Sequence, residues 1–340
     1  MKASILCLVP SLAILPALGV AGPANDRPYQ VTATFPIGGP GGWDYMTVDP
    51  DHGLLFVPRS THTQVINASN GSVVADIPGQ KRNHGVALVP SAGRGFITDG
   101  EDGSVTIFDL KTYAALGKIK AQDDADGVIY DAASNKVLAV CGDAGVLVPI
   151  SPTVDPVKGT ADPAIALGGK PEFLAADGKG RVFVNLVDKD QVAVVDLKTS
   201  KVLAHWPVSP GGAPVGMAID PKSGHLFIGC RKPQKLIVMN CDDGRVVADL
   251  PIGRGVDAVV FDRGLALASC GDGTLTVVGE KAPGQYAVIQ TVTTRPGART
   301  AGVDTKTHKI YLPTAEFQES TGQGRPRPKP DTFMVLQVSN

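Results

Sequence analysis

The segment RVVADLPIG at residues 245–253 nearly repeats SVVADIPG at residues 72–79. In the same way, QVAVVDLKT at 191–199 nearly repeats SVTIFDLKT at 104–112. Related segments recur about every forty residues from near residue 30 to the C-terminus, and a fixed period of this size indicates one supersecondary unit repeated along the chain. The fold therefore follows from the structure of one unit and from the number of units.

Most units contain four short apolar runs, which in the fifth unit are GMAI (216–219), HLFIGC (225–230), KLIVM (235–239) and RVVADLP (245–251). Gly, Asp, Asn and Pro separate these runs, as is typical of antiparallel strands joined by tight turns. Four strands at this period predict a β-propeller blade. The turns between the first two strands of the units begin at Asp49, Val89, Asp131, Asp177, Asp220, Asp262 and Asp304. The sequence thus predicts an all-β fold, a seven-bladed β-propeller of four-stranded antiparallel blades.

The last unit lacks a fourth strand, because its third strand, TFMVLQV at 332–338, is followed only by Ser339 and Asn340. At the other end of the chain, YQVTATFP at 29–36 matches the fourth-strand pattern of KVLAHWP at 201–207. We therefore expect the N-terminal strand to complete the last blade. Closure of this kind leaves no unpaired edge where chains could aggregate. An open stack of units is the alternative.

Two long stretches carry a family resemblance: VFVNLVDKDQVAVVDLKTSKVLAHWPV at 182–208 and LFIGCRKPQKLIVMNCDDGRVVADLPIG at 226–253. They resemble the YVTN-type repeat of YncE-like exported bacterial β-propellers, and the resemblance covers residues 29–340. It implies an exported propeller and carries no shared catalytic motif. The Gly-His and Trp-Asp dipeptides of WD repeats are missing, and the two tryptophans, Trp43 and Trp206, argue against the Trp-rich blades of quinone-dependent dehydrogenases.

Residues 1–21 have the pattern of an export signal, since Lys2 precedes an apolar run and Gly19-Val20-Ala21 offers a cleavage point. A retained N-terminal anchor is the alternative. We expect residues 22–340 to form a single propeller domain, periplasmic or secreted after cleavage, with no membrane span in the mature chain. The chain has 32 Lys and Arg against 33 Asp and Glu, so it lacks the basic excess that a nucleic-acid partner would require. The sequence identifies no protein or small-molecule partner.

Charged residues recur five positions before the first turn of each unit, where the chain enters the innermost strand. The residues at these positions are Asp44, His84, Asp126, Glu172, Val215, Asp257 and Arg299. Because the innermost strands of a propeller line its channel, we predict a ring at the channel mouth and take its six ionisable members as candidate ligand-binding residues. A solvated polar lining without a ligand is the alternative.

The order of the residues around the ring indicates how their charges interact. Arg299 falls between Asp257 and Asp44, which predicts an ion-paired arc, and His84 falls between two carboxylates, which should raise its pKa. Asp126 and Glu172 are neighbours without an obvious cation, so a divalent metal, a ligand amine or a shared proton could lie between them. No organic cofactor is expected, and the sequence does not define a set of metal ligands.

Four cysteines follow the export signal, and three of them recur at the last position of the second strand. The residues at that position are Arg59, Asp99, Cys141, Leu186, Cys230, Cys270 and Thr314. Three thiols at one ring position are suggestive of a soft metal site, but Cys is also a common small buried residue. The spacing between blades exceeds the reach of a disulfide, so we expect these three thiols and Cys241 to be free.

One insertion, Glu316 to Asp331, interrupts the last unit and contains Gly324-Arg325-Pro326-Arg327-Pro328-Lys329-Pro330. Alternating prolines favour an extended conformation, and we expect this segment over or beside the channel mouth, either as a stiff solvated loop or as a lid or docking element. The sequence lacks C-x-x-C-H, H-E-x-x-H and G-x-S-x-G, so no catalytic residue is assigned. The function predicted is a binding or interaction scaffold. The alternative, a lactonase- or hydrolase-type enzyme, depends on fold analogy and the acidic ring.

Overall fold

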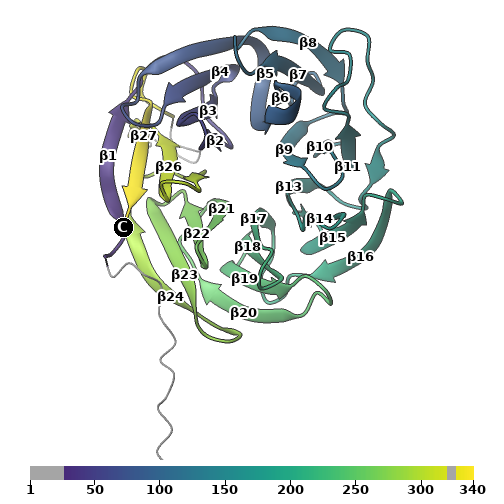
Figure 1. Cartoon of the computed structure of the whole chain (residues 1–340). Helices are drawn as coiled ribbons and strands as arrows, with labels where there is room; N and C mark the ends of the chain where they lie inside the picture. Colours follow the sequence, from purple (N-terminus) through teal and green to yellow (C-terminus); the bar gives the residue numbers. More distant parts are fainter. Residues whose placement is uncertain (1–26, 320–326) are drawn as a thin grey trace, which may run out of the picture.

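The computed structural model describes residues 27–319 and 327–340, which form a β-propeller around a central channel (Figure 1). In the four-stranded sheets the strands follow one another from the channel to the rim, except that β1 forms the rim of the last sheet. The predicted export signal at residues 1–21 lies outside the described residues. No helix in the described ranges combines the length and the apolar character needed to cross a membrane.

Residues 47–120 form one seven-stranded sheet. Its strands are β2 (Thr47–Asp49), β3 (Leu54–Pro58), β4 (Ser60–Asn67), β5 (Val73–Val89), β6 (Arg94–Asp99), β7 (Ser104–Asp109) and β8 (Ala115–Lys120). A single 3-10 turn, η1 (Pro90–Ala92), joins β5 to β6. The two halves of this sheet pack on each other through Phe56, Ile97 and Phe108.

The other five sheets are four-stranded blades. Two of them contain β9 (Ala125–Asp131), β10 (Lys136–Cys141), β11 (Val146–Ile150) and β12 (Ile165–Ala166), then β13 (Pro171–Ala176), β14 (Arg181–Leu186), β15 (Gln191–Asp196) and β16 (Lys201–Pro207). The next two contain β17 (Pro214–Asp220), β18 (His225–Arg231), β19 (Gln234–Asn240) and β20 (Val246–Pro251), then β21 (Val256–Asp262), β22 (Leu265–Cys270), β23 (Thr274–Ala282) and β24 (Gln285–Thr293). The last contains β25 (Gly302–Asp304), β26 (Lys309–Thr314), β27 (Met334–Ser339) and β1 (Gln30–Pro36).

The prediction of seven four-stranded blades is therefore wrong, because the structure has five such blades and one seven-stranded sheet. The cause is β5, which serves as the outer strand beside β4 and continues as the strand beside β6. Asn83 pairs with Ser60 on one side and with Asp99 on the other, so the two sheets merge at this residue. Its buried side-chain amide also donates to the Thr63 hydroxyl at 2.9 Å, which ties β5 to β4 where the sequence predicted a break.

The prediction that the N-terminal strand closes the ring is confirmed. Strand β1 pairs antiparallel with β27 from Gln30 opposite Ser339 to Pro36 opposite Met334, and Figure 1 shows the two side by side. At one end, the Tyr29 backbone exchanges two hydrogen bonds with the Gln290 side chain of the preceding blade, at 2.9 and 2.7 Å. At the other end, the side chain of Phe35 lies so close to Gly71 that a Cβ there would sit 2.4 Å from it. Strand β1 therefore contacts three sheets.

Turns between third and fourth strands have the Asx chemistry that the sequence indicated. The side chains of Asn67, Asp109, Asp196 and Asn240 each accept a hydrogen bond from the backbone N–H two residues later, at 2.7 to 3.0 Å. Hydrophobic clusters form the core, and most of them combine side chains of two neighbouring sheets. Cys141, Cys230 and Cys270 belong to three different clusters.

The loop that leads to the channel mouth is wrapped around a fully buried arginine. Arg59 donates to the carbonyls of Gly39 at 3.1 Å, Pro40 at 2.9 Å and Gly42 at 2.9 Å, and its guanidinium lies 3.6 Å from the centre of the Phe333 ring. No carboxylate of the described residues pairs with it, and burial lowers its pKa to about 10. The carbonyl groups of residues 39–42 thus stabilise the charged Arg59 side chain, and Arg59 fixes the conformation of this loop.

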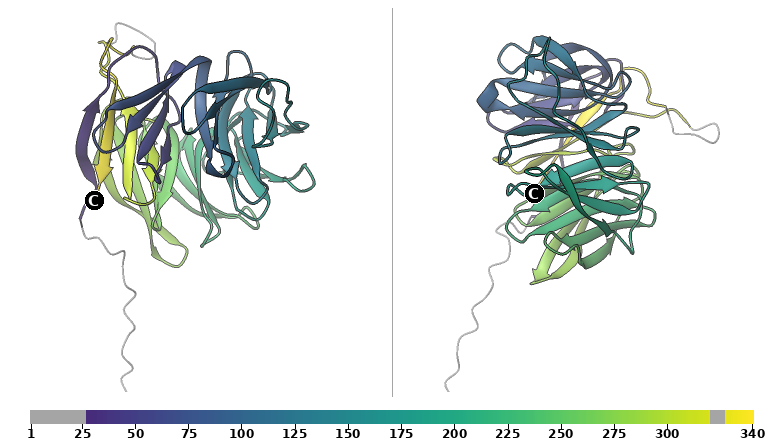
Figure 2. Two further views of the ribbon diagram at one scale, coloured as in Figure 1. Left: turned by 45° about the horizontal axis from the view of Figure 1, so that its top comes forward. Right: turned by 90° about the vertical axis from the view of Figure 1, so that its right-hand side faces the viewer.

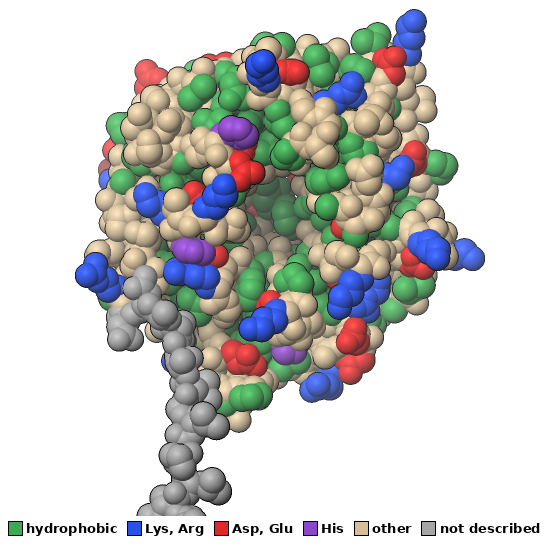
Figure 3. All heavy atoms as spheres, viewed as in Figure 1, with side chains coloured by type: hydrophobic (Ala, Val, Ile, Leu, Met, Phe, Trp, Pro, Cys, Tyr) green, Lys and Arg blue, Asp and Glu red, His purple; other side chains and the backbone are tan. Residues whose placement is uncertain are grey.

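The faces of the propeller differ. The arms of the blade insertion extend beyond one face (Figure 2), joined by hydrogen bonds between Glu316 and Lys329 and between Gln318 and Arg327. Residues 320–326, including Gly324, Arg325 and Pro326, lie outside the described residues. Figure 3 shows the other face, which is hollowed at its centre with hydrophobic side chains around the opening.

Candidate functional site

Local backbone geometry explains how the ring residues reach the channel mouth. In β5, β9, β13, β17 and β21 the strand register shifts where His84, Asp126, Glu172, Val215 and Asp257 stand. A bulge of this kind leaves a residue outside the regular pairing and redirects its side chain. Side chains of neighbouring sheets then bind the freed carbonyls: the Thr98 hydroxyl donates to the Asp126 carbonyl at 2.5 Å, and the Asn185 amide donates to the Val215 carbonyl at 2.7 Å. The residues that recur five positions before the first turn of each unit thus stand at a bulge that recurs in five of the innermost strands.

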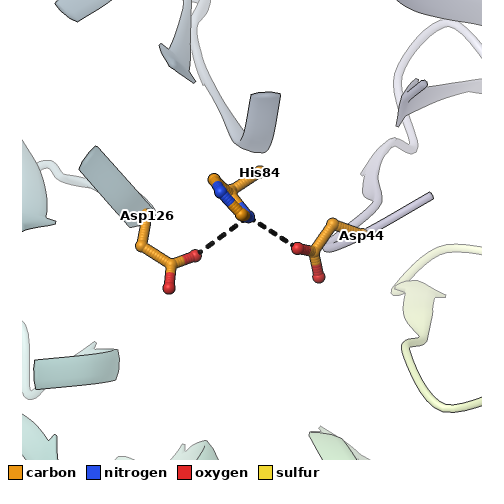
Figure 4. Close-up of side chains that lie close together, drawn as sticks. All are labelled: Asp44, His84 and Asp126. Atoms are coloured by element: carbon orange, nitrogen blue, oxygen red, sulfur yellow. Dashed lines mark hydrogen bonds and ion pairs between the residues drawn. The ribbon is translucent and has the colours of Figure 1, made fainter. Parts of the chain in front are cut away.

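Three of the predicted residues meet in one cluster (Figure 4). His84 Nδ1 lies 2.7 Å from Asp44 Oδ2 and 3.5 Å from Asp126 Oδ1, so the imidazole stands between a carboxylate from the loop before β2 and one from β9. Burial lowers the pKa of His84, but the hydrogen bond to Asp44 and the charge of Asp126 outweigh it and raise the pKa to about 9. His84 is therefore a cation at neutral pH, as the order of residues around the ring predicted.

The Asp126 carboxyl is the least compensated acid of the mouth. Burial raises its pKa well above the usual range, and the nearby charges of Asp44 and Glu172 add to that shift against the opposing charge of His84. Burial also raises the pKa of Glu172, although Arg231 opposes it. Both carboxyl groups therefore accept protons more readily than exposed acids.

Asp257 lies at the centre of the predicted ion-paired arc. Its Oδ2 accepts a hydrogen bond from Arg299 Nε at 2.5 Å, and its Oδ1 accepts one from an Arg231 terminal nitrogen. Arg299 also lies 3.9 Å from Asp44, which connects the arc to the His84 cluster. The side chain of Asp257 is 7% exposed, against 31% for Arg299 and 30% for Arg231. The guanidinium groups therefore cover the acid and face outward.

Arg231 is the functional residue that the sequence analysis missed. It ends β18 and occupies the part of the ring where the predicted position holds Val215, which is fully buried. Its Nη1 lies 3.9 Å from Glu172, so the expectation that Asp126 and Glu172 lack a cation is wrong: His84 serves the first and Arg231 the second. A signal was present in the sequence, because Arg231 is the only charged residue at its unit position, where the other units have Ser60, Gly100, Gly142, Val187, Gly271 and Ala315.

An aromatic pair lines the channel next to the ring. The rings of Tyr45 and Phe173, each one residue after a ring acid, have centroids 4.6 Å apart. Tyr45 is 8% exposed, and its hydroxyl makes no hydrogen bond with the described residues. Burial, followed by the charges of Asp257 and Glu172, raises the pKa of that hydroxyl well above its usual value. Beyond the pair, the channel continues as a cavity of about 240 Å³ with mostly Val, Ala and Gly in its lining.

The second set of ring positions is structural. Arg59, Asp99, Cys141, Leu186, Cys230, Cys270 and Thr314 are all fully buried. The four described cysteines are unbridged, as predicted, and burial raises the pKa of each thiol to about 12. Since the three repeated thiols lie in separate hydrophobic clusters, they fill the core and do not form a joint metal site.

A pocket of about 590 Å³ opens beside the ring, between the mouth and the base of the insertion. Arg231 and Arg299 line it together with Trp43, Phe317 and glycine backbone. The rings of Trp43 and Phe317 meet edge to face with centroids 6.1 Å apart. The insertion therefore contributes a wall to a pocket at the mouth, which agrees with the expected position beside the channel. We call this space the mouth pocket.

The comparisons with known proteins support the fold. No protein-family model matches the sequence, and no match was found among curated proteins. Among solved structures, the chain is similar to one described as Kuenenia stuttgartiensis hydrazine synthase, with a TM-score of 0.69 and 13% sequence identity over 81% of this chain and 93% of that chain. The chain is a β-propeller. At this identity the likeness shows the fold alone, and the resemblance to YncE-like proteins stays a prediction.

Proposed function

We propose that this propeller is a binding protein that takes a small ligand at the channel mouth, in the mouth pocket. The observation that carries the proposal is the position of Arg231 and Arg299, which belong to the ionic ring and also line a pocket of about 590 Å³. Ligand pockets of proteins commonly have this volume and combine apolar walls with a few fixed polar groups. The ring supplies the fixed groups, because seven ionisable side chains hold one another in place.

Pairing within the ring favours binding over catalysis. A general base needs a pKa near the working pH and an unengaged lone pair within reach of the substrate. At the mouth, Asp44 engages His84, and Asp257 engages two guanidinium groups. Such an arrangement fixes the orientation of charges, which positions a ligand. The predicted periplasmic or secreted location is consistent with a protein that captures small molecules outside the cytoplasm.

Trp43 offers a direct test of this proposal, since the chain has only two tryptophans. In a Trp206→Phe protein, Trp43 is the sole reporter, and a chemically diverse fragment library can be screened by its emission. We expect hits that saturate and that bind Arg231→Met protein about tenfold or more weakly, because a charged hydrogen bond contributes about 1.5–3 kcal/mol.

Two further variants keep the test interpretable. Phe317→Ala changes only the wall that the insertion contributes and should also weaken binding of the fragments. Lys198→Met lies in a separate cavity lined by Lys136 and Lys179, so it should leave the affinity of the fragments unchanged. Hits that bind all of these proteins equally would place the site elsewhere, and a screen without saturable hits would contradict the proposal.

A second candidate is a metal-dependent hydrolase, favoured by the Asp44, His84 and Asp126 cluster, whose ligand atoms lie within 4.8 Å of one another. Two carboxylates and an imidazole suit Mn²⁺ or Zn²⁺, and such an ion would supply Lewis-acid chemistry at the mouth. It ranks second because the ion would have to replace the proton that His84 shares with Asp44.

Mn²⁺ titration followed by electron paramagnetic resonance tests the metal site without an activity assay. If the candidate is right, one equivalent should bind, and Asp126→Asn should weaken binding about tenfold or more, since a charged ligand is lost. Asp220→Asn, in a turn remote from the mouth, is the control. Absence of saturable binding at millimolar Mn²⁺ would rule the candidate out.

A further inference from the structure

The two arginines of the mouth pocket have hydrogen-bond donors to spare. Arg231 uses Nε for the Val256 carbonyl and one terminal nitrogen for Asp257, while its Nη1 is 3.9 Å from Glu172, beyond hydrogen-bonding distance. Arg299 uses Nε for Asp257 and Nη2 for the Trp43 carbonyl, and its Nη1 donates to none of the described residues. Both guanidinium groups thus keep an N–H group that no described residue binds.

The charge that the pocket presents to a ligand is positive. Its lining contains Arg231 and Arg299 and no Asp or Glu. The acid that fixes them, Asp257, is 7% exposed and lies behind them. A planar guanidinium is well suited to bind a carboxylate. The pair already holds one buried carboxylate, because Arg299 donates to one oxygen of Asp257 and Arg231 donates to the other.

The rest of the lining is apolar. Trp43 and Phe317 present ring surfaces, and Pro296 and Pro328 add further carbon atoms. A ligand with a flat apolar body gains from this surface, because burial of apolar area is favourable and aromatic pairs add a further contribution. The volume of about 590 Å³ leaves ample room for a single ring with a short side chain.

We propose that the mouth pocket takes a small monocarboxylate with an aromatic or similar flat apolar body, its carboxylate bound by Arg231 and Arg299 and its body packed on Trp43 and Phe317. This inference rests on the proposed function, since it names the class of ligand for the same pocket. A single negative charge fits better than two. Asp44 and Glu172 each lie 3.9 Å from one of the guanidinium groups, and each additional charge on the ligand is repelled by them.

A series of matched probes tests the ligand class in the Trp206→Phe protein. Benzoate carries the carboxylate and the ring, benzamide is its neutral isostere, benzylammonium reverses the charge, phenyl phosphate carries about two charges, and acetate lacks the ring. We expect benzoate to bind about tenfold or more tightly than benzamide, which loses a charged hydrogen bond, and than acetate, which loses the apolar contact. Benzoate should also bind more tightly than phenyl phosphate, whose second negative charge is repelled by Asp44 and Glu172. Benzylammonium should give no saturable change in Trp43 emission.

Variants connect the series to the two arginines. Arg299→Lys keeps the charge but loses the planar fork, so benzoate binding should fall several-fold while benzamide binding changes little. Lys329→Gln is the matched control, because it removes one positive charge from the insertion, where Lys329 pairs with Glu316 at 3.3 Å, and it should leave benzoate binding unchanged. Thermal melting of each variant shows that the fold is intact before binding is compared.

The outcomes separate this inference from the proposed function. If library fragments bind at Trp43 but benzamide or benzylammonium matches benzoate, the pocket is a binding site and the carboxylate class is wrong. Equal loss of benzoate binding in Arg299→Lys and Lys329→Gln would show a general charge effect and would also overturn the class. If neither the library nor any probe changes Trp43 emission, both the inference and the proposed function fail.

Discussion

A chain that begins at Ile37 is expected to lose its cooperative unfolding transition. Such a chain lacks β1 and leaves β27 with an unpaired edge along Met334–Ser339. It also lacks the two hydrogen bonds to Gln290 and the contact of Phe35 with Gly71, so three sheets lose their connection at once. Differential scanning calorimetry should show a broad transition of low enthalpy, and size-exclusion chromatography should show association through the open edge.

The matched control for this truncation is a chain that begins at Arg27, which keeps β1 and should unfold cooperatively. A synthetic peptide of residues 27–37 should restore the transition in the shortened chain, because a free strand can add to an exposed sheet edge. A scrambled peptide of the same composition should not. If the chain that begins at Ile37 melts with the same midpoint and enthalpy as the control, the closure has no role in stability.

Replacement of Arg59 by Met should be the most destabilising single substitution at the mouth. The variant fills the space but leaves the carbonyls of residues 38–42 without their donor. Loss of two or more hydrogen bonds to a charged group should lower the free energy of unfolding by about 3–5 kcal/mol. Urea unfolding measures this change, and Trp43 emission should move to longer wavelength as the loop that precedes Trp43 loosens.

Two controls bracket the effect of Arg59. Arg245→Met removes an exposed arginine and should change stability by about 0.5 kcal/mol or less. Arg59→Lys keeps a positive charge but cannot reach both sides of the loop, so it should fall between the wild type and Arg59→Met. If Lys were as stable as Arg at this position, charge alone would hold the loop and the geometry of the guanidinium would be irrelevant.

Much of the propeller could be predicted because its signals are local and repeated. The Asx turns at Asn67 and Asn240, and the fourth-strand pattern of residues 29–36, depend on nearby residues that recur in several units. The number of blades depended instead on a single crossing. Asn83 joins two sheets through pairings on both sides and a side-chain hydrogen bond to Thr63, and no repeated pattern signals such a residue.

The candidate site could also be predicted only in part. Asp44, His84 and Asp126 occupy the same position in successive units, so the repeat predicts that their side chains lie close together. Arg231 reaches the ring from a second strand, and its contact with Asp257 depends on side-chain length and direction, which a spacing argument does not contain. The mouth pocket depends on how the insertion folds back, and this too is a matter of three-dimensional packing.

The continuous strand β5 gives the ring one connection between neighbouring units that contains no loop. Other neighbouring sheets are connected by loops, such as residues 252–255 between β20 and β21, and loops can absorb small rotations. Along β5, a displacement of the outer half passes through the backbone directly to the inner half. We therefore expect relative motion of the blades mainly at the loop connections. His84, which lies on β5, should then keep its position relative to both halves of the seven-stranded sheet.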